Sequence, residues 1–213
     1  LNRSLKTLAN VEPEIALKHP NWKMGKKISI DSSTLMNKIF EYIEAKKIFN
    51  LKKKNISIII HPSSFVHAIV FFKGDIIKIL AHNTNMSIPI SNALGIRNKL
   101  KKKFISSSFN KLNSLKFISP KKKQFPVLSI IDLIPEKETY FETILITIND
   151  TLVKMYLDRQ INYLSIQQNL LNLIKKPYFK KFYKLKPKNI YDIKKTIMIT
   201  KKYLKDNLIK NEI

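Results

Sequence analysis

The stretch from position 19 to position 45, which reads HPNWKMGKKISIDSSTLMNKIFEYIEA, decides the fold. It holds the only tryptophan of the chain, one of its three glycines and one of its four histidines. Residues 19–26 have neither a helical nor a strand period, so we expect a loop there. Ile28 and Ile30 then alternate with polar residues, which favours a short strand over 27–31.

A helix is expected to follow this strand. Ser32 or Ser33 can cap it, because a short hydroxyl accepts a hydrogen bond from a free amide of the first turn. From position 34 onward, apolar residues recur at helical spacing along one side, and Asn37, Lys38 and Glu41 gather on the other. Lys38 and Glu41 are three residues apart, so both side chains can reach one small ligand.

This polar face has two interpretations. Amides, ammonium groups and carboxylates commonly keep an amphipathic helix soluble, and the period cannot separate that role from a site. A strand that delivers a helix N-terminus also presents free amides and a positive dipole end, where an anion can bind. The residue pattern leaves both interpretations open.

The formal net charge of +25 is typical of nucleic-acid-binding proteins. Arginine, however, occurs only at Arg3, Arg97 and Arg159, whereas specific readout favours arginine for its planar fork. Lys, Ile, Asn, Phe and Tyr are all abundant, and all have A/T-rich codons, so a genome rich in A and T can account for the lysine excess. We therefore expect no specific nucleic-acid partner.

The absence of cysteine is compatible with a cytoplasmic location. With no run of about 18 apolar residues, no membrane contact is expected.

Beyond the opening stretch, the sequence predicts an α+β fold. Residues 56–60 form a nearly continuous β-branched run, as in a strand buried on both faces. Residues 65–72 and 76–81 have the pattern of antiparallel strands joined by a tight turn. One helix is expected to begin near Pro13, and further helices are expected over 90–96, 127–133, 138–158, 163–175 and 191–207.

Two histidines near the predicted strands raise the question of a metal site. His61 and His67 lie six residues apart. That spacing suits no standard zinc arrangement, and no cysteine is available as a further ligand. We interpret both as structural residues of the sheet.

The opening stretch closely resembles the 1-deoxy-D-xylulose 5-phosphate reductoisomerases. The resemblance rests on HPNWKMG at 19–25, ISIDSST at 28–34, and MNK at 36–38 followed by Glu41 and Glu44. It continues more thinly through 60–67, 86–90 and 125–126. It covers nearly the whole chain but only about the C-terminal half of the family's full-length enzyme.

This resemblance implies an oxidoreductase of non-mevalonate isoprenoid biosynthesis. The family converts 1-deoxy-D-xylulose 5-phosphate to 2-C-methyl-D-erythritol 4-phosphate with NADPH and a divalent metal. Residues 1–96 would be the C-terminal part of an α/β catalytic domain with a small mixed or antiparallel sheet and an active-site lid loop at 19–26. Residues 97–124 would be a connecting arm, and 125–213 a C-terminal α-helical domain.

The resemblance also assigns roles to residues of the opening stretch. Glu41 would be a ligand of Mg²⁺ or Mn²⁺, with Co²⁺ as a further option, because hard oxygen ligands suit these ions. Trp22 and Met24 would belong to the lid, and Gly25 would lie near NADPH. The implied substrate-binding and catalytic residues are His19, Ser32, Asn37, Lys38 and Glu41.

The family's other acidic metal ligands, its catalytic lysine and its NADPH domain would all precede residue 1. Three glycines could hardly build a dinucleotide loop. We therefore expect the chain alone to be inactive. Its expected partners are an N-terminal half, in the same polypeptide or a separate one, a sugar-phosphate substrate and a second copy in a homodimer.

Several positions depart from the family pattern. Asn85 and Ser87 replace an Asp and an Arg, and the Ile39-Phe40 pair replaces Gly-Leu. Asn149-Asp150 stands where the family has Asn-Glu, and we interpret that pair as structural. These departures leave two alternatives to an active enzyme, namely a decayed non-catalytic remnant and, with less support, a basic nucleic-acid-binding module.

Overall fold

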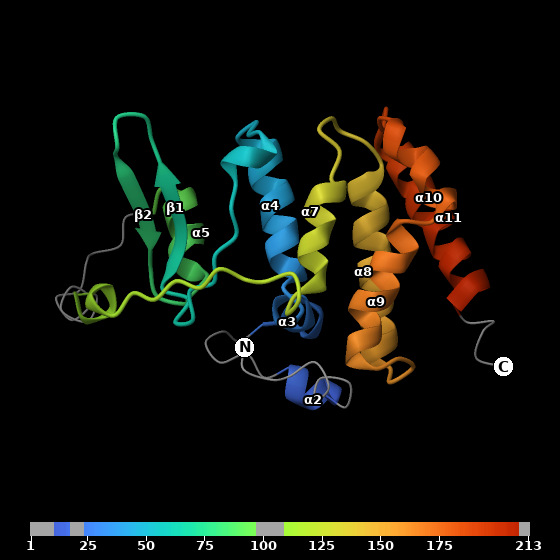
Figure 1. The fold of residues 1–213 in the computed structure, drawn as a ribbon, viewed down its shortest axis with the longest axis horizontal. Helices are drawn as coiled ribbons and strands as arrows, with labels where there is room; N and C mark the ends of the chain where they lie inside the picture. Colours follow the sequence, from blue (N-terminus) through green and yellow to red (C-terminus); the bar gives the residue numbers. More distant parts are fainter. Residues whose placement is uncertain (1–10, 18–23, 97–108, 209–213) are drawn as a thin grey trace. The chain divides into compact units, whose positions relative to one another are not determined.

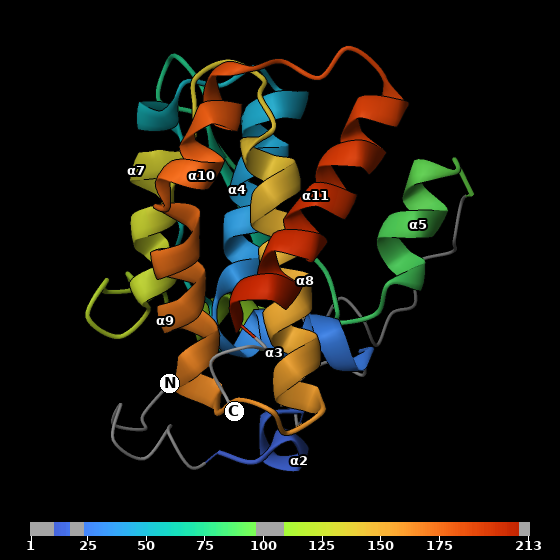
Figure 2. The ribbon, with the colours of Figure 1, turned by 90° about the vertical axis from the view of Figure 1, so that its right-hand side faces the viewer.

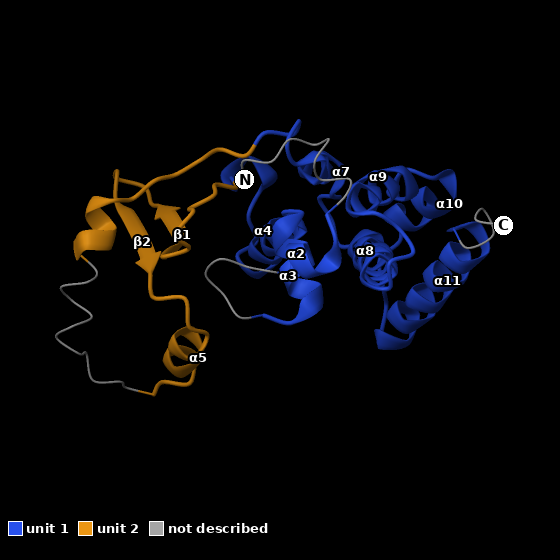
Figure 3. Ribbon diagram, turned by 90° about the horizontal axis from the view of Figure 1, so that it is seen from below, with its two compact units in different colours: residues 1–19, 24–57, 121–213 blue, residues 20–23, 58–120 orange. Residues whose placement is uncertain are grey.

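The computed structural model describes residues 11–17, 24–96 and 109–208 of the 213-residue chain (Figure 1). The chain divides into two compact units, which Figure 3 colours separately. Unit 1 comprises residues 1–19, 24–57 and 121–213, and unit 2 comprises 20–23 and 58–120. The fold class is α+β, as predicted. In unit 1, residues 24–57 pack with the C-terminal helices.

Unit 1 is helical in its described part. Its α8 packs against α9, α11 and α3, and Figure 2 shows α9 and α11 on either side of it. Asn162 caps α9 by accepting a hydrogen bond from the Ser165 amide at 3.0 Å. The elements are α2 Pro13–Ala16, α3 Lys26–Ser33, α4 Met36–Ile48, η1 Lys53–Asn55, η2 Pro126–Ser129, α7 Ile130–Leu133, α8 Phe141–Leu157, α9 Tyr163–Ile174, α10 Pro177–Lys180, η3 Lys181–Lys184 and α11 Ile190–Leu208.

The core of unit 1 is built around α8, a long helix with many buried residues. Its residues Ile144, Leu145, Ile148 and Leu152 are fully buried. This agrees with the predicted helical segments, whose apolar spacing gives each helix a face to bury. The predicted helices over 138–158, 163–175 and 191–207 are confirmed, with small shifts at their ends, and the helix predicted over 127–133 is divided into the 3₁₀ helix η2 and the α-helix α7.

Several tyrosines are built into this core. Burial raises the pKa of Tyr156, Tyr163 and Tyr183 above the usual value of about 10. The Tyr183 hydroxyl donates to the Ile174 carbonyl at 2.7 Å, and the Tyr156 hydroxyl donates to the Val11 carbonyl at 2.8 Å. Above about pH 10, the folded state therefore keeps phenol protons that the unfolded chain releases.

We expect the chain to lose stability as the pH rises above about 10. Above that pH the unfolded state binds fewer protons than the folded state, so the free energy of unfolding falls with pH. Urea unfolding between about pH 8 and about pH 11, followed by circular dichroism and tyrosinate absorbance, measures this. Tyr183→Phe should flatten the decline, and an equally steep decline in that variant would contradict the assignment.

The predicted strand over 27–31 is wrong, because the structure places these residues in helix α3. The alternation does not mark two sheet faces: Ile30 is fully buried, whereas 46% of Ile28 is exposed. Hydroxyl groups bond to the helix backbone instead, with Ser29 donating to the Gly25 carbonyl and Ser33 to the Ile30 carbonyl. These bonds within the helix satisfy the serine hydroxyls, so a short segment with alternating serine and isoleucine can still be helical.

The predicted serine cap is also wrong. Ser32 and Ser33 lie inside α3, and α4 begins two residues beyond Thr34, at Met36. The residue between, Leu35, adopts a left-handed backbone with φ 67° and has no side-chain cap bond. The two helices are therefore joined by a tight turn. The helix predicted from position 34 itself is confirmed.

In unit 2, strands β1 Val66–Phe71 and β2 Ile77–Ala81 form an antiparallel hairpin, drawn in green in Figure 1. Gly74 and Asp75 lie in the tight connection between the strands and have positive φ values of 80° and 61°, a backbone region that glycine and aspartate tolerate better than most residues. Both predicted strands and their connection are confirmed. The hairpin leaves large apolar side chains exposed, including 74% of Phe71.

Helix α5, Ser87–Ala93, follows the hairpin and begins three residues earlier than predicted. The Asn85 side chain accepts a hydrogen bond from the Ser87 amide at 2.9 Å. These are the two positions at which the family's charged residues are replaced. At these two positions the chain therefore has a local hydrogen bond at the start of α5.

The predicted strand over 56–60 is wrong in all but its last residue. Ile60 alone pairs, in a single antiparallel bridge with Ile118. Ile59 is exposed, and its neighbours are only half-buried, so this run is not covered on both faces. Among the described residues, no helix is long and apolar enough to span a membrane.

Candidate functional site

The exposed face of α4 brings three predicted site residues together. The Asn37 side-chain amide donates to Glu41 Oε1 at 2.8 Å. The Lys38 ammonium group contacts both oxygens of the same carboxylate, at 2.9 Å and 2.7 Å. All three side chains remain accessible to solvent. This cluster can present donors to oxygen atoms of a ligand and one carboxylate to a cation.

The turn before α4 fixes where this face begins. The buried Thr34 hydroxyl donates to the Ile30 carbonyl at 3.1 Å and accepts from the Met36 amide at 3.4 Å. Leu35 and Met36 are buried in the core of unit 1. Apolar packing and one hydroxyl thus hold the first turn of α4, while its outer face stays free to contact a ligand.

Ser32 lies half-buried on α3, close in sequence to this turn. Met24 is half-buried and Gly25 exposed, directly before α3 begins. Gly25 has φ −61°, so the backbone there does not require glycine. His19 and Trp22 lie outside the described residues, so their predicted roles stay predictions.

A buried polar network on α3 was not identified as a site from the sequence. Asp31 is 1% exposed, and its Oδ1 accepts a hydrogen bond from the Asn149 amide group at 2.8 Å. Its Oδ2 pairs with Lys27 at 2.8 Å, and Lys27 also pairs with Asp150 at 3.0 Å. The structural interpretation of Asn149-Asp150 agrees with these contacts.

For both Asp31 and Lys27, burial and hydrogen bonding shift the pKa in opposite directions. Burial raises the pKa of the Asp31 carboxyl, although Lys27 and Asn149 oppose this effect. Burial lowers the pKa of Lys27, but its hydrogen bonds to Asp31 and Asp150 outweigh burial and leave that pKa raised. Hydrogen bonds and opposite charges therefore favour the ionised forms of Asp31 and Lys27, whereas burial alone would disfavour both.

Further polar contacts join the segments before and after the predicted lid to α8, α9 and the turn between them. Tyr163 on α9 donates to the Ser33 hydroxyl at 3.0 Å. Arg159, in the turn after α8, pairs with Glu12 and Glu14 at the start of α2. Sequence patterns give no signal for such contacts, because their partners are more than a hundred residues apart.

The described residues fit a divalent metal only in part. Glu41 supplies one hard oxygen donor group, which suits Mg²⁺ or Mn²⁺. Across residues 11–17, 24–96 and 109–208, no group of three or more His, Cys, Asp or Glu side chains could hold a metal ion. Glu41 can therefore serve as one ligand but cannot complete a coordination shell with its described neighbours.

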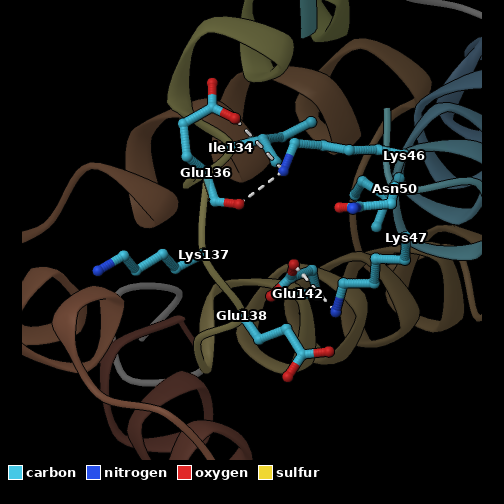
Figure 4. Close-up of a pocket in the computed structure, with 9 residues that line it drawn as sticks. Lys46, Lys47, Asn50, Ile134, Glu136, Lys137, Glu138 and Glu142 are labelled. Carbon is cyan, nitrogen blue, oxygen red and sulfur yellow. Dashed lines mark hydrogen bonds and ion pairs between the residues drawn. The ribbon is translucent and has the colours of Figure 1, made fainter. Parts of the chain in front are cut away.

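A small polar cavity of about 110 Å³ lies in unit 1, away from the predicted site residues (Figure 4). Lys46 from α4 donates to the Glu136 carbonyl at 2.8 Å, and Lys47 pairs with Glu142 at 3.1 Å. Its positive and negative groups are largely paired with one another. The residues that line it are Ile43, Lys46, Lys47, Asn50, Ile134, Glu136, Lys137, Glu138 and Glu142.

The two histidines considered as metal ligands make other contacts. His61 is within 2.8 Å of the Lys116 carbonyl and 2.7 Å of the Ser63 hydroxyl. The ring of His67 stacks on that of His82 with centroids 3.7 Å apart. These contacts support the interpretation that both histidines are structural.

Known proteins were compared with this sequence and this fold. Residues 1–49 match the family described as "1-deoxy-D-xylulose 5-phosphate reductoisomerase C-terminal domain". Residues 82–203 match the "DXP reductoisomerase C-terminal domain". The class that the sequence matches and the fold define is thus the C-terminal region of a reductoisomerase. The chain belongs to the 1-deoxy-D-xylulose 5-phosphate reductoisomerase family.

Individual relatives agree with this assignment. The reductoisomerase of Pelagibacter ubique is 45% identical over 192 residues, covering 90% of this chain and 50% of that protein. The Haemophilus ducreyi enzyme is 38% identical over 167 residues, covering 78% of this chain and 42% of that protein. The chain spans about half the length of the curated relatives it matches.

Solved structures give the same result for the fold. A DOX-P reductoisomerase in complex with NADPH, fosmidomycin and magnesium has a TM-score of 0.83 at 28% identity, over 96% of this chain and 50% of its own. The Zymomonas mobilis reductoisomerase in complex with NADPH has a TM-score of 0.77 at 27% identity, over 93% of this chain and 50% of its own.

Proposed function

We propose that this chain supplies the C-terminal half of an enzyme that converts 1-deoxy-D-xylulose 5-phosphate to 2-C-methyl-D-erythritol 4-phosphate in isoprenoid biosynthesis. One observation carries the proposal: Asn37, Lys38 and Glu41 form a bonded cluster on an exposed helix face. The cluster lies within the stretch that carries the family resemblance. The three side chains place an amide, an ammonium group and a carboxylate within reach of one small ligand.

The chain's own residues would bind and orient the substrate. Lys38 supplies a positive point charge and Asn37 two amide donors, which suit the hydroxyl and phosphate oxygens of a sugar phosphate. Ser32, together with His19 on the preceding loop, would donate to the phosphate. Trp22 and Met24 would exclude water from the site as parts of a lid.

Two cofactors complete the proposal. Glu41 would be one ligand of Mg²⁺ or Mn²⁺, and Gly25 would lie near NADPH; structures of relatives hold NADPH and magnesium. When bound, the ion polarises the substrate carbonyl and NADPH supplies a hydride. The remaining ligands and the dinucleotide site would come from an N-terminal half, without which the chain is inactive.

The exposed hairpin of unit 2 supports a requirement for partners. A two-stranded hairpin is marginally stable alone, and β1 and β2 expose large apolar side chains such as Phe71 and Leu80. We propose that the N-terminal half and a second copy of the chain in a homodimer cover this surface. We also assign the enzyme to the cytoplasm, which is compatible with the absence of cysteine from this chain.

A chimeric enzyme tests the proposed function. The N-terminal half of the Pelagibacter ubique reductoisomerase would be fused to this chain, and NADPH oxidation by 1-deoxy-D-xylulose 5-phosphate would be followed with Mg²⁺ present. We expect the chimera to turn over the substrate and the chain alone to show no activity. A folded chimera without activity would reject the proposal and favour the decayed remnant.

A further inference from the structure

The Asp31 carboxylate is the most constrained charged group in the described part of α3. It lies directly before Ser32, the predicted phosphate contact. Its two oxygens have different partners, with Asn149 of α8 on Oδ1 and Lys27 of α3 on Oδ2. Lys27 then reaches Asp150 of α8. The carboxylate thus connects α3 to α8 both directly and through an ion pair.

Packing alone would not call for a carboxylate here. Burying a charge is costly unless it is paired and hydrogen-bonded, and apolar residues of similar size often stabilise a fold at least as well. A directional pair of contacts instead fixes how α3 is rotated and placed against α8. The Tyr163 hydroxyl adds a third fixed point, at Ser33.

We propose that Asp31 is a positioning residue for the phosphate subsite. By fixing α3 on α8 through Asn149 and Lys27, it holds the adjacent Ser32 where it can donate to a substrate phosphate. This inference rests on the proposed function. Asp31 itself contacts no substrate in this proposal.

The first test measures the chain itself. Amide hydrogen exchange would be compared between the original chain and Asp31→Asn, with Asp132→Asn as the matched control on an exposed carboxylate of α7. We expect the α3 amides to exchange roughly ten times faster in Asp31→Asn, with α4 and α8 little changed. Unchanged exchange of α3 would overturn the proposal whatever the activity.

The second test uses the active chimera. Asp31→Asn should raise the KM for the sugar phosphate roughly tenfold, with a smaller change in kcat, because a displaced contact weakens substrate binding. Asp132→Asn should leave both constants unchanged. A purely structural role would lower the active fraction and leave KM unchanged, which would overturn the positioning role.

A compensating exchange provides the rescue. The double variant Asp31→Asn with Asn149→Asp places the amide on α3 and the carboxylate on α8, so a hydrogen bond of the same type can form. Its KM should return most of the way to the original value. If KM stays raised although the double variant folds, α3 is not positioned by this contact. An original chimera that is folded but inactive would instead reject the proposed function, and this inference would fail with it.

Discussion

Glu41→Gln in the chimera is expected to lower kcat/KM by about two to four orders of magnitude, because losing a metal ligand removes several kcal/mol of transition-state stabilisation. The carboxylate is exposed, so the substitution should leave the melting temperature nearly unchanged. Glutamine can still accept a hydrogen bond from Asn37 but offers no charge to a cation. The measurement is NADPH oxidation over a series of Mg²⁺ concentrations.

Glu44→Gln is the matched control for this prediction. It removes the same charge from the same helix, three residues further on, and Glu44 is also exposed. Its activity should stay within about twofold of the original chimera, as for surface positions away from a site. Equal losses in the two variants, or a Glu41→Gln enzyme that keeps most of its activity, would remove Glu41 from the metal site.

Ile144→Ala should destabilise unit 1 by about 2–5 kcal/mol, because it opens a cavity in the core beside the first turn of α8. Ile144 is fully buried, whereas 43% of Ile146 on the same helix is exposed. Ile146→Ala is therefore expected to cost less than about 1 kcal/mol. Both variants share the same gain in helix propensity, so the difference between them isolates burial.

Urea unfolding followed by circular dichroism measures this difference. The midpoint should fall sharply for Ile144→Ala and little for Ile146→Ala, with similar slopes if unfolding stays cooperative. Equal shifts in the two variants would contradict the central place of α8 in the core. A changed slope in Ile144→Ala alone would indicate that unit 1 no longer unfolds as one body.

The sequence predicts α4 and its polar cluster because the helical period is local. Asn37, Lys38 and Glu41 share a face whenever that segment is helical, and their contacts follow from spacing alone. The same local argument fails for α3. Two isoleucines separated by one serine satisfy a strand pattern, yet the hydroxyls bond to the helix and Asp31 needs α8 as its partner.

Packing accounts for two residues that depart from the family pattern, Ile39 and Phe40. Ile39 is fully buried in the core of unit 1. Lys27 places its ammonium group 5.0 Å from the centre of the Phe40 ring. Larger side chains therefore contribute contacts at these two positions. They do not by themselves favour a decayed protein.

The insertion of unit 2 within unit 1 has a consequence for synthesis. Helices α3 and α4 leave the ribosome long before α8, and 118 residues separate Asp31 from Asn149. At about 5–20 residues per second, the nascent chain waits on the order of ten seconds before this buried carboxylate finds its partner. During that interval α4 can pack against α3, but its contact with η2 cannot form, because η2 is made only after unit 2.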